Sequence, residues 1–176
     1  MKDIKNILFD LGGVLYHIDY NLTKVAFEKL GVNDFNTHYS QQQQNKLFDN
    51  LETGKISSKE FISKMLEIIP HSNQEDIVDA WNALLIGFTK ENLKLLEYLS
   101  GKYKLYLLSN TNAIHIEKIN SELQDRFGRA SLGEFFEKTY LSHEIGRRKP
   151  DVETFEWLLK DAGIKAEETL FIEDSI

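Results

Sequence analysis

Residues 4–13 read IKNILFDLGG, a short apolar run that ends in an acidic residue and a pair of glycines. Short apolar runs that are bounded by turn-forming residues are typical of β-strands. We therefore expect a strand over Ile4–Phe9, closed by Asp10 and by the Gly12-Gly13 pair. The first predicted strand thus carries a carboxylate at its carboxyl end.

The rest of the chain alternates between short apolar runs and longer stretches with helical spacing. Further strands are predicted at Leu105–Leu108, Lys138–Leu141 and Thr169–Ile172. Helices are predicted at Asn92–Leu99, Ile114–Phe127 and Val152–Ala162. This alternation predicts an α/β fold, in which a doubly wound parallel sheet is covered by helices on both faces.

Residues 20–88 interrupt this alternation with helical patterns and no convincing strand. The predicted helices are Leu22–Leu30, Gln41–Phe48, Lys59–Ile69 and Gln74–Ile86. Ser57 followed by Glu60 is a helix start signal, and Gly31 and Pro70 are stop signals. We interpret the block as an inserted helical cap over residues 17–88, joined to an α/β core made of residues 1–16 and 89–176.

Composition excludes several classes of site and partner. The 176 residues contain no cysteine, so disulfides, a thiolate nucleophile and a zinc–thiolate site are impossible. The net charge of −7 argues against binding to a nucleic-acid backbone. No apolar run approaches the roughly twenty residues of a membrane span, and no signal peptide is evident. We expect a cytoplasmic enzyme with a small-molecule substrate; the oligomeric state is left open.

Polar residues follow each predicted strand, where open α/β sheets bind their ligands. The set comprises three acids, a hydroxyl, an amide and an ammonium group: Asp10, Glu173, Asp174, Ser109, Asn110 and Lys149. Carboxylates bind Mg²⁺, a cation neutralises phosphate, and one carboxylate can attack phosphorus. The sequence therefore indicates phosphoryl chemistry at one edge of the sheet.

Four segments resemble the ordered motifs of the haloacid dehalogenase (HAD) superfamily. They are FDLGGVL at 9–15, LLSNT at 107–111, RKP at 148–150 and FIEDS at 171–175. Their spacing is similar to that of the subgroup with a helical cap after the first strand of a Rossmann-like core. The first motif is most similar to that of the sugar-phosphatase branch that includes α-D-glucose-1-phosphatase.

The resemblance implies a Mg²⁺-dependent phosphatase that acts on a small phosphorylated metabolite, with a sugar phosphate favoured. Asp10 would be the nucleophile that attacks phosphorus. Asp10, the carbonyl group of Gly12 and Asp174 would bind Mg²⁺, with Glu173 at the same metal site.

The resemblance also assigns the phosphate-binding residues. Ser109 and the neighbouring amide of Asn110 would hold the phosphoryl oxygens. Lys149 would pair with both the nucleophile and the phosphoryl group, which keeps Asp10 ionised beside an anion.

One departure from the family pattern concerns proton transfer. Most phosphatases of this superfamily carry an acid two residues after the nucleophile, where this chain has Gly12. The dehalogenases also lack that acid, but they lack the acidic pair as well, so Glu173-Asp174 favours phosphoryl transfer. His17 is a weak candidate for the missing proton donor, and Asp19 a weaker one for binding a substrate hydroxyl.

Two alternatives to the phosphatase stay open: a 2-haloacid dehalogenase and a non-catalytic, phospho-ligand-binding or regulatory protein. The second is motivated by the missing acid and by the end of the sequence at Ile176, directly after the fourth motif. Arg147 and Arg148 are expected to be a solvated basic pair. Trp81 and Trp157 are expected to be core residues and not a substrate platform.

Overall fold

A four-stranded parallel sheet forms the centre of the molecule, which we describe from a computed structural model for residues 3–32 and 46–174. Its strand order is β5-β4-β1-β6. The bounds are β1 (Asn6–Phe9), β4 (Lys104–Ser109), β5 (Lys138–Leu141) and β6 (Thr169–Ile172). Each predicted strand is present to within two residues, and each pairing is parallel.

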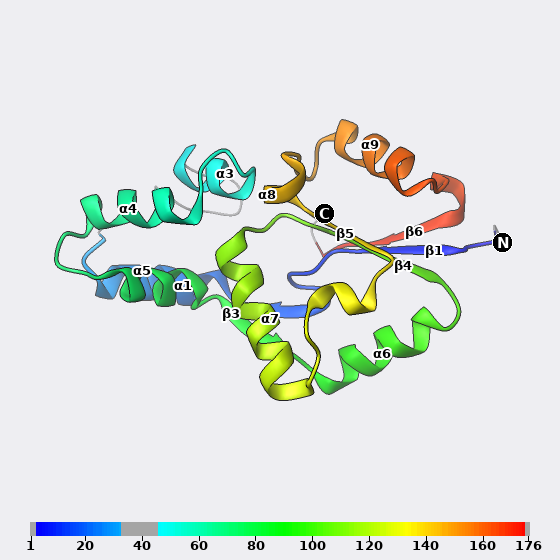
Figure 1. Ribbon diagram of the computed structural model, residues 1–176, viewed down its shortest axis with the longest axis horizontal. Coiled ribbons are helices and arrows are strands. Elements are labelled where there is room, and N and C mark those ends of the chain that lie inside the picture. The colour runs from blue at the N-terminus through cyan, green and yellow to red at the C-terminus, as the bar shows by residue number, and fades with distance from the viewer. Residues whose placement is uncertain (1–2, 33–45, 175–176) are drawn as a thin grey trace.

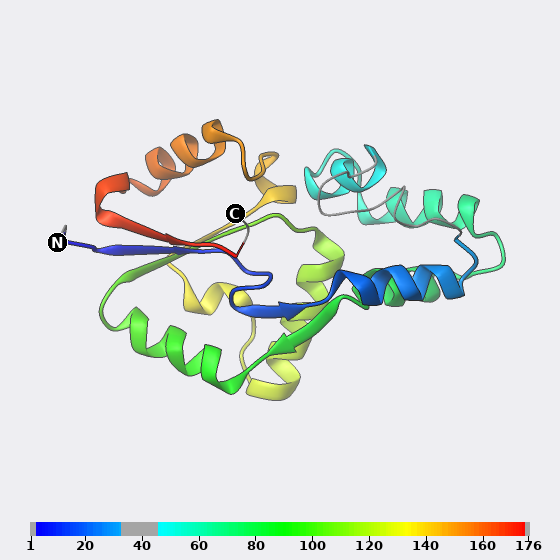
Figure 2. The same cartoon turned by 180° about the vertical axis from the view of Figure 1, so that it is seen from behind.

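Helices cover both faces of this sheet, as predicted. Helices α6 (Lys90–Ser100) and α7 (Ala113–Phe127) lie on one side, and α9 (Val152–Ala162) lies on the other (Figures 1 and 2). Successive strand residues point to opposite faces. Phe9 therefore packs in the cluster that contains Leu96 and Leu123, while Leu8 packs in the cluster that contains Leu158. The doubly wound α/β fold is confirmed.

A second, helical lobe extends to one side of the sheet (Figure 1). Among the described residues it contains α1 (Tyr20–Lys29), α3 (Lys46–Glu52), α4 (Ser58–Ile68) and α5 (Gln74–Asn82). Its core is aromatic: Phe48 stacks on Trp81 with ring centroids 5.1 Å apart, and Phe61 and Phe27 are fully buried beside them. We call residues 20–32 and 46–82 the cap lobe.

Local signals account for the start of α4. The Ser57 side chain accepts a hydrogen bond from the Glu60 amide at 3.2 Å, and the Glu60 carboxylate accepts one from the Ser57 amide at 2.8 Å. This capping box satisfies two of the amide groups at the helix start. The predicted helix Gln41–Phe48 is only partly testable, because residues 41–45 lie outside the described ranges; α3 begins at Lys46.

The expectation of no strand in residues 20–88 is wrong. Strand β3 (Leu85–Phe88) pairs antiparallel with β2 (Tyr16–Ile18), and this two-stranded ribbon connects the core to the cap lobe (Figure 2). Helix α5 therefore ends at Asn82 and not at Ile86. The pairing partner of Leu85–Phe88 lies about seventy residues earlier in the chain, so a local pattern could not reveal it.

None of the helices in the described ranges could span a membrane. The longest of them, α7, has 15 residues. A helix that crosses a bilayer needs about 20 predominantly apolar residues.

Candidate active site

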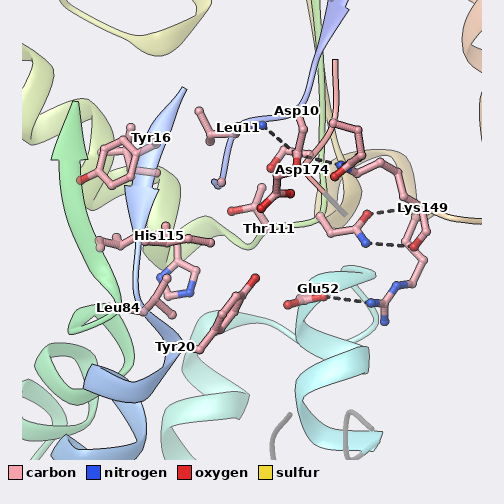
Figure 3. A pocket seen from close by; sticks show the side chains of 18 of the residues that line it. Asp10, Leu11, Tyr16, Tyr20, Glu52, Leu84, Thr111, His115, Lys149 and Asp174 are labelled. Carbon is pink, nitrogen blue, oxygen red and sulfur yellow. Dashed lines mark hydrogen bonds and ion pairs between the residues drawn. The ribbon is translucent and has the colours of Figure 1, made fainter. Parts of the chain in front are cut away.

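The carboxyl ends of three neighbouring strands bring the predicted site residues together. Asp10 directly follows β1, Ser109 ends β4, and Glu173 directly follows β6. They line a cavity of about 810 Å³ between this sheet edge and the cap lobe (Figure 3). All seven residues that the family resemblance assigns to catalysis, phosphate binding or the metal line the same cavity: Asp10, Gly12, Ser109, Asn110, Lys149, Glu173 and Asp174.

A buried ion pair lies at the centre of the site. The Nζ atom of Lys149 is 2.8 Å from Oδ1 of Asp10, and it also pairs with the carboxylate of Glu173. Asp10 is 7% exposed and Lys149 is 9% exposed. A buried carboxylate and ammonium group that face each other stabilise each other's charge. The arrangement gives Asp10 a cationic neighbour where an anionic substrate group would approach.

The loop that carries Lys149 is held by the side chain of Asn110. The Asn110 Nδ2 atom donates a hydrogen bond to the Lys149 carbonyl at 2.9 Å, and the Lys149 amide donates one to Asn110 Oδ1 at 2.9 Å. Asn110 thus fixes the backbone of Lys149 relative to the end of β4. A second crosslink joins the next residue, Thr111, to α8 (Ser142–Ile145): the Ser142 hydroxyl accepts from the Thr111 amide and donates to its carbonyl, both at 2.9 Å.

Three carboxylates form a group with the geometry of a metal site. One oxygen from each of Asp10, Glu173 and Asp174 lies within 4.8 Å of the others. A side chain at residue 13 would prevent this approach: a Cβ atom built on Gly13, whose φ is +78°, would lie 2.0 Å from Oδ2 of Asp174. Oxygen-only donors with several carboxylates fit Mg²⁺ and do not fit a soft metal.

Burial and crowding raise the pKa of these acids. Burial raises the pKa of Asp10 to about 6, with a further increase from Glu173, while Lys149 opposes the rise. The pKa of Asp174 is also raised, first by its burial and then by Glu173. Carboxylates crowded in this way repel one another, and a divalent cation among them would relieve the repulsion.

The cavity also has residues that the sequence did not single out. They include Tyr20 and Glu52 of the cap lobe, Leu84 between α5 and β3, and His115 of the core helix α7, which lie opposite the carboxylate group (Figure 3). The ring of His115 stacks on Trp81 with centroids 5.0 Å apart, and its Nδ1 atom is 2.9 Å from Oδ1 of Asn82. His115 therefore joins the core to the cap lobe. Trp81 is fully buried, as predicted for a core residue.

The prediction that Arg148 belongs to a solvated pair is wrong. Its guanidinium group forms ion pairs with Asp49 and Glu52 of α3, the latter at 3.5 Å, and Arg148 lines the cavity. Asp49 lies 99 residues away in the sequence, so only the folded chain brings the partners together. Arg147 instead lies over the ring of Trp157, 5.5 Å from its centroid.

The space beside Gly12 is filled by an apolar side chain. A Cβ atom built on Gly12 would lie 2.9 Å from Cδ1 of Ile18. Neither weak candidate lines the cavity. His17, the candidate proton donor, is exposed on β2, and Asp19, the candidate for binding a substrate hydroxyl, accepts a hydrogen bond from the Asn21 amide at the start of α1. The structure therefore gives no support to a role for His17 in proton transfer.

Comparison with known proteins agrees with this geometry. The sequence model of haloacid dehalogenase-like hydrolases matches residues 4–176. The chain is 36% identical over 176 residues to D-ribitol-5-phosphate phosphatase of Bacteroides thetaiotaomicron, an alignment that covers 97% of this chain and 83% of that protein.

Two solved structures are similar over nearly the whole chain. A HAD family enzyme of Bacteroides thetaiotaomicron, in complex with magnesium and inorganic phosphate, has a TM-score of 0.83 and 38% identity over 98% of this chain and 85% of that one. A predicted HAD-like family hydrolase of Porphyromonas gingivalis has a TM-score of 0.87 and 33% identity, and the match covers 98% of this chain and 82% of that one.

Proposed function

This chain belongs to the haloacid dehalogenase-like hydrolases, among which it is a phosphatase that uses Mg²⁺, and we propose that it hydrolyses the phosphate monoester of a small sugar or sugar alcohol through a phosphorylated Asp10. One observation carries the proposal. The buried Asp10–Lys149 ion pair lies beside two further carboxylates at the ends of adjacent strands.

Each proposed role follows from position and charge. An oxygen of Asp10 attacks phosphorus in line, the bond from phosphorus to the substrate oxygen breaks, and the departing alkoxide takes up a proton. Water then attacks the acyl phosphate, which releases inorganic phosphate and restores the Asp10 carboxylate. Lys149 neutralises charge on the phosphoryl group, while Ser109 and the Asn110 amide bind its oxygens.

The metal-binding residues in this proposal are Asp10, the carbonyl group of Gly12 and Asp174, with Glu173 beside them. When bound there, Mg²⁺ supplies a positive charge that offsets the charge of the phosphoryl oxygens. The oxygen donors and the close approach of Asp174 to Gly13 support this assignment.

The substrate class is proposed from the relative and from the size of the cavity. The protein of Bacteroides thetaiotaomicron is named for D-ribitol 5-phosphate, a phosphorylated sugar alcohol. A cavity of about 810 Å³ has room for a molecule of that kind. The cap lobe is proposed to exclude water from the reacting groups. A cytoplasmic location stays a prediction.

The leaving group is the demanding part of this reaction. Ribitol 5-phosphate is the ester of a primary alcohol, whose alkoxide leaves poorly without a proton, and residue 12 is a glycine. General acid catalysis is typically worth about 10²–10⁴-fold. We therefore predict faster turnover of esters of acidic alcohols, including aryl phosphates and sugar 1-phosphates, than of primary alkyl phosphates.

Phosphate release from p-nitrophenyl phosphate, with Mg²⁺ or with EDTA, tests the proposal. We expect turnover only with the metal, and a loss of at least about 10³-fold in Asp10→Asn, because an amide is isosteric but cannot act as the anionic nucleophile. Asp125→Asn, the same change at an exposed position of α7, is the control, and circular dichroism checks the fold of both.

Three other results would count against the proposal. Activity of Asp10→Asn within tenfold of the wild type would contradict the covalent step. Chloride release from 2-chloropropionate would favour a dehalogenase. Release of neither product would favour a non-catalytic, phospho-ligand-binding protein.

A further inference from the structure

A cluster of three charged groups lies at the end of the cavity that faces the cap lobe, and two of its members, Glu52 and Arg148, line the cavity. Glu52 of α3 is 6% exposed and lines the cavity. Its carboxylate forms an ion pair at 3.5 Å with the guanidinium group of Arg148, which also pairs with Asp49 of the same helix. Figure 3 shows Glu52 and its ion pair across the cavity from Asp10 and Asp174. We call Asp49, Glu52 and Arg148 the distal cluster.

The two ends of the cavity differ in the charge that they can accept. Among the described residues that line it, Arg148 and Lys149 are the only lysine or arginine side chains. Lys149 lies at the phosphoryl end, in contact with Asp10 and Glu173. Arg148 is shared between two carboxylates, so the distal cluster carries one more negative than positive charge. A second anionic group of a substrate would meet Glu52 there, with no cation in excess within the cluster.

Tyr20, which lies beside the distal cluster, is exposed to the same negative electrostatic potential. The hydroxyl of Tyr20 points into the cavity (Figure 3). Burial raises the pKa of Tyr20 to about 12, and the largest charge effect in the same direction comes from Glu52, followed by the three carboxylates of the metal group. The negative potential at this point opposes the binding of a further anionic group. Neutral hydroxyl groups of a substrate can instead donate hydrogen bonds to a carboxylate and accept them from a guanidinium group.

We propose that the distal cluster selects phosphate monoesters whose remaining part is uncharged and hydroxylated, and that Glu52 determines the rejection of substrates with a second anionic group. This inference rests on the proposed phosphatase function and narrows its substrate class. Phosphorylated carboxylic acids and bisphosphates are poor substrates. Like charges that face each other in a partly buried site oppose binding strongly, which gives specificity without a change of shape.

Two commercially available esters that differ at one carbon provide the test. Sorbitol 6-phosphate ends in a hydroxymethyl group, and 6-phosphogluconate ends in a carboxylate at the same position. We expect kcat/KM of the wild type with Mg²⁺ to be at least about tenfold higher for sorbitol 6-phosphate. In Glu52→Gln, which keeps the shape but removes the charge, this preference is expected to fall by about tenfold.

Two further variants separate the charge effect from damage to the fold. Asp49→Asn removes the second, half-exposed carboxylate that pairs with Arg148, and is expected to lower the preference as well. This variant therefore tests the charge effect even if Glu52→Gln destabilises the protein. Glu67→Gln, at an exposed position of α4 outside the cavity, is the matched control and is expected to keep the wild-type preference. An effect of the substitutions on Lys149 through the adjacent Arg148 changes kcat/KM for both esters alike, so it cancels in their ratio.

The outcomes are distinguishable from failure of the proposed function. Hydrolysis of p-nitrophenyl phosphate with Mg²⁺, together with equal kcat/KM for the two six-carbon esters, overturns this inference alone. An unchanged preference in both Glu52→Gln and Asp49→Asn overturns the role of the distal cluster. Absence of metal-dependent hydrolysis of every ester overturns the proposed function and this inference with it.

Discussion

The contact between His115 and the cap lobe predicts a measurable dependence of stability on pH. The imidazole ring is buried between Trp81 and the side chain of Asn82. Burial lowers the pKa of His115 from 6.5 to about 3, and the neighbouring His143 contributes in the same direction. Folding therefore requires a neutral ring.

The sign and size of the effect follow from this shift. Between pH 6.5 and pH 3 the unfolded chain binds a proton at His115 that the folded chain does not bind, so stability falls as the pH falls through this window. The contribution is complete above pH 6.5. At pH 5 the loss is about 2 kcal/mol, from about 1.36 kcal/mol for each of the roughly 1.5 pH units below the unfolded value.

Urea unfolding at pH 7 and pH 5 measures this loss when the wild type is compared with His115→Gln. Glutamine cannot titrate, so the difference in unfolding free energy between wild type and variant should shrink by about 2 kcal/mol at the lower pH. Because the variant also loses the ring contacts at both pH values, the informative quantity is the change in this free-energy difference between pH 7 and pH 5. His17→Gln, at an exposed position, controls for the loss of an imidazole. Parallel pH profiles of wild type and His115→Gln would refute the reasoning.

Three further predictions concern the site and its support. The double variant Gly12→Asp with Ile18→Ala adds a proton donor and the space for it, so it should raise the turnover of alkyl phosphates by up to about 10²-fold. A series of aryl and alkyl phosphates measures this effect. If the turnover rate of the wild type did not depend on the leaving group, an acid would already be present. Gly54→Ala should cost about 2 kcal/mol or more in urea unfolding, since its φ is +67° and a Cβ atom would lie 2.1 Å from a carbonyl oxygen of α8; Gly128→Ala, with the same φ and open space, should cost less. Asn110→Ala should lower kcat/KM about 10–100-fold by releasing the backbone of Lys149, the lysine proposed to bind the phosphoryl group, while Mg²⁺ affinity stays within a few-fold; an equal loss of metal affinity would contradict this positioning role.

Much of the fold and of the phosphoryl end of the site could be predicted because the signals are local. A strand such as Thr169–Ile172 is a continuous apolar run, and the acids that follow it are adjacent in the chain. In a parallel sheet the carboxyl ends of neighbouring strands share one edge, so residues that follow different strands converge whatever the details of packing. Asp10, Lys149 and Asp174 were therefore found from the sequence, and they line one cavity.

The remaining features depend on partners that are distant in the sequence. Leu85–Phe88 continues a helical pattern, and only its pairing with Tyr16–Ile18 makes it a strand. Arg148 stands in a basic triplet that is typical of a solvated loop, and Glu52 ends an amphipathic helix; their ion pair exists only because α3 packs against the loop that precedes Lys149.

The order of residues was sufficient for the α/β alternation and for finding the strand-end residues that line the cavity, since the hydrophobic period and the residues at strand ends can be read from consecutive positions. The folded chain was needed for the ribbon between core and cap lobe, the contact of His115 with Trp81 and the charge of the distal cluster. The physical reason is that burial and electrostatic pairing act through space, between groups whose separation along the chain carries no information about their distance in the fold.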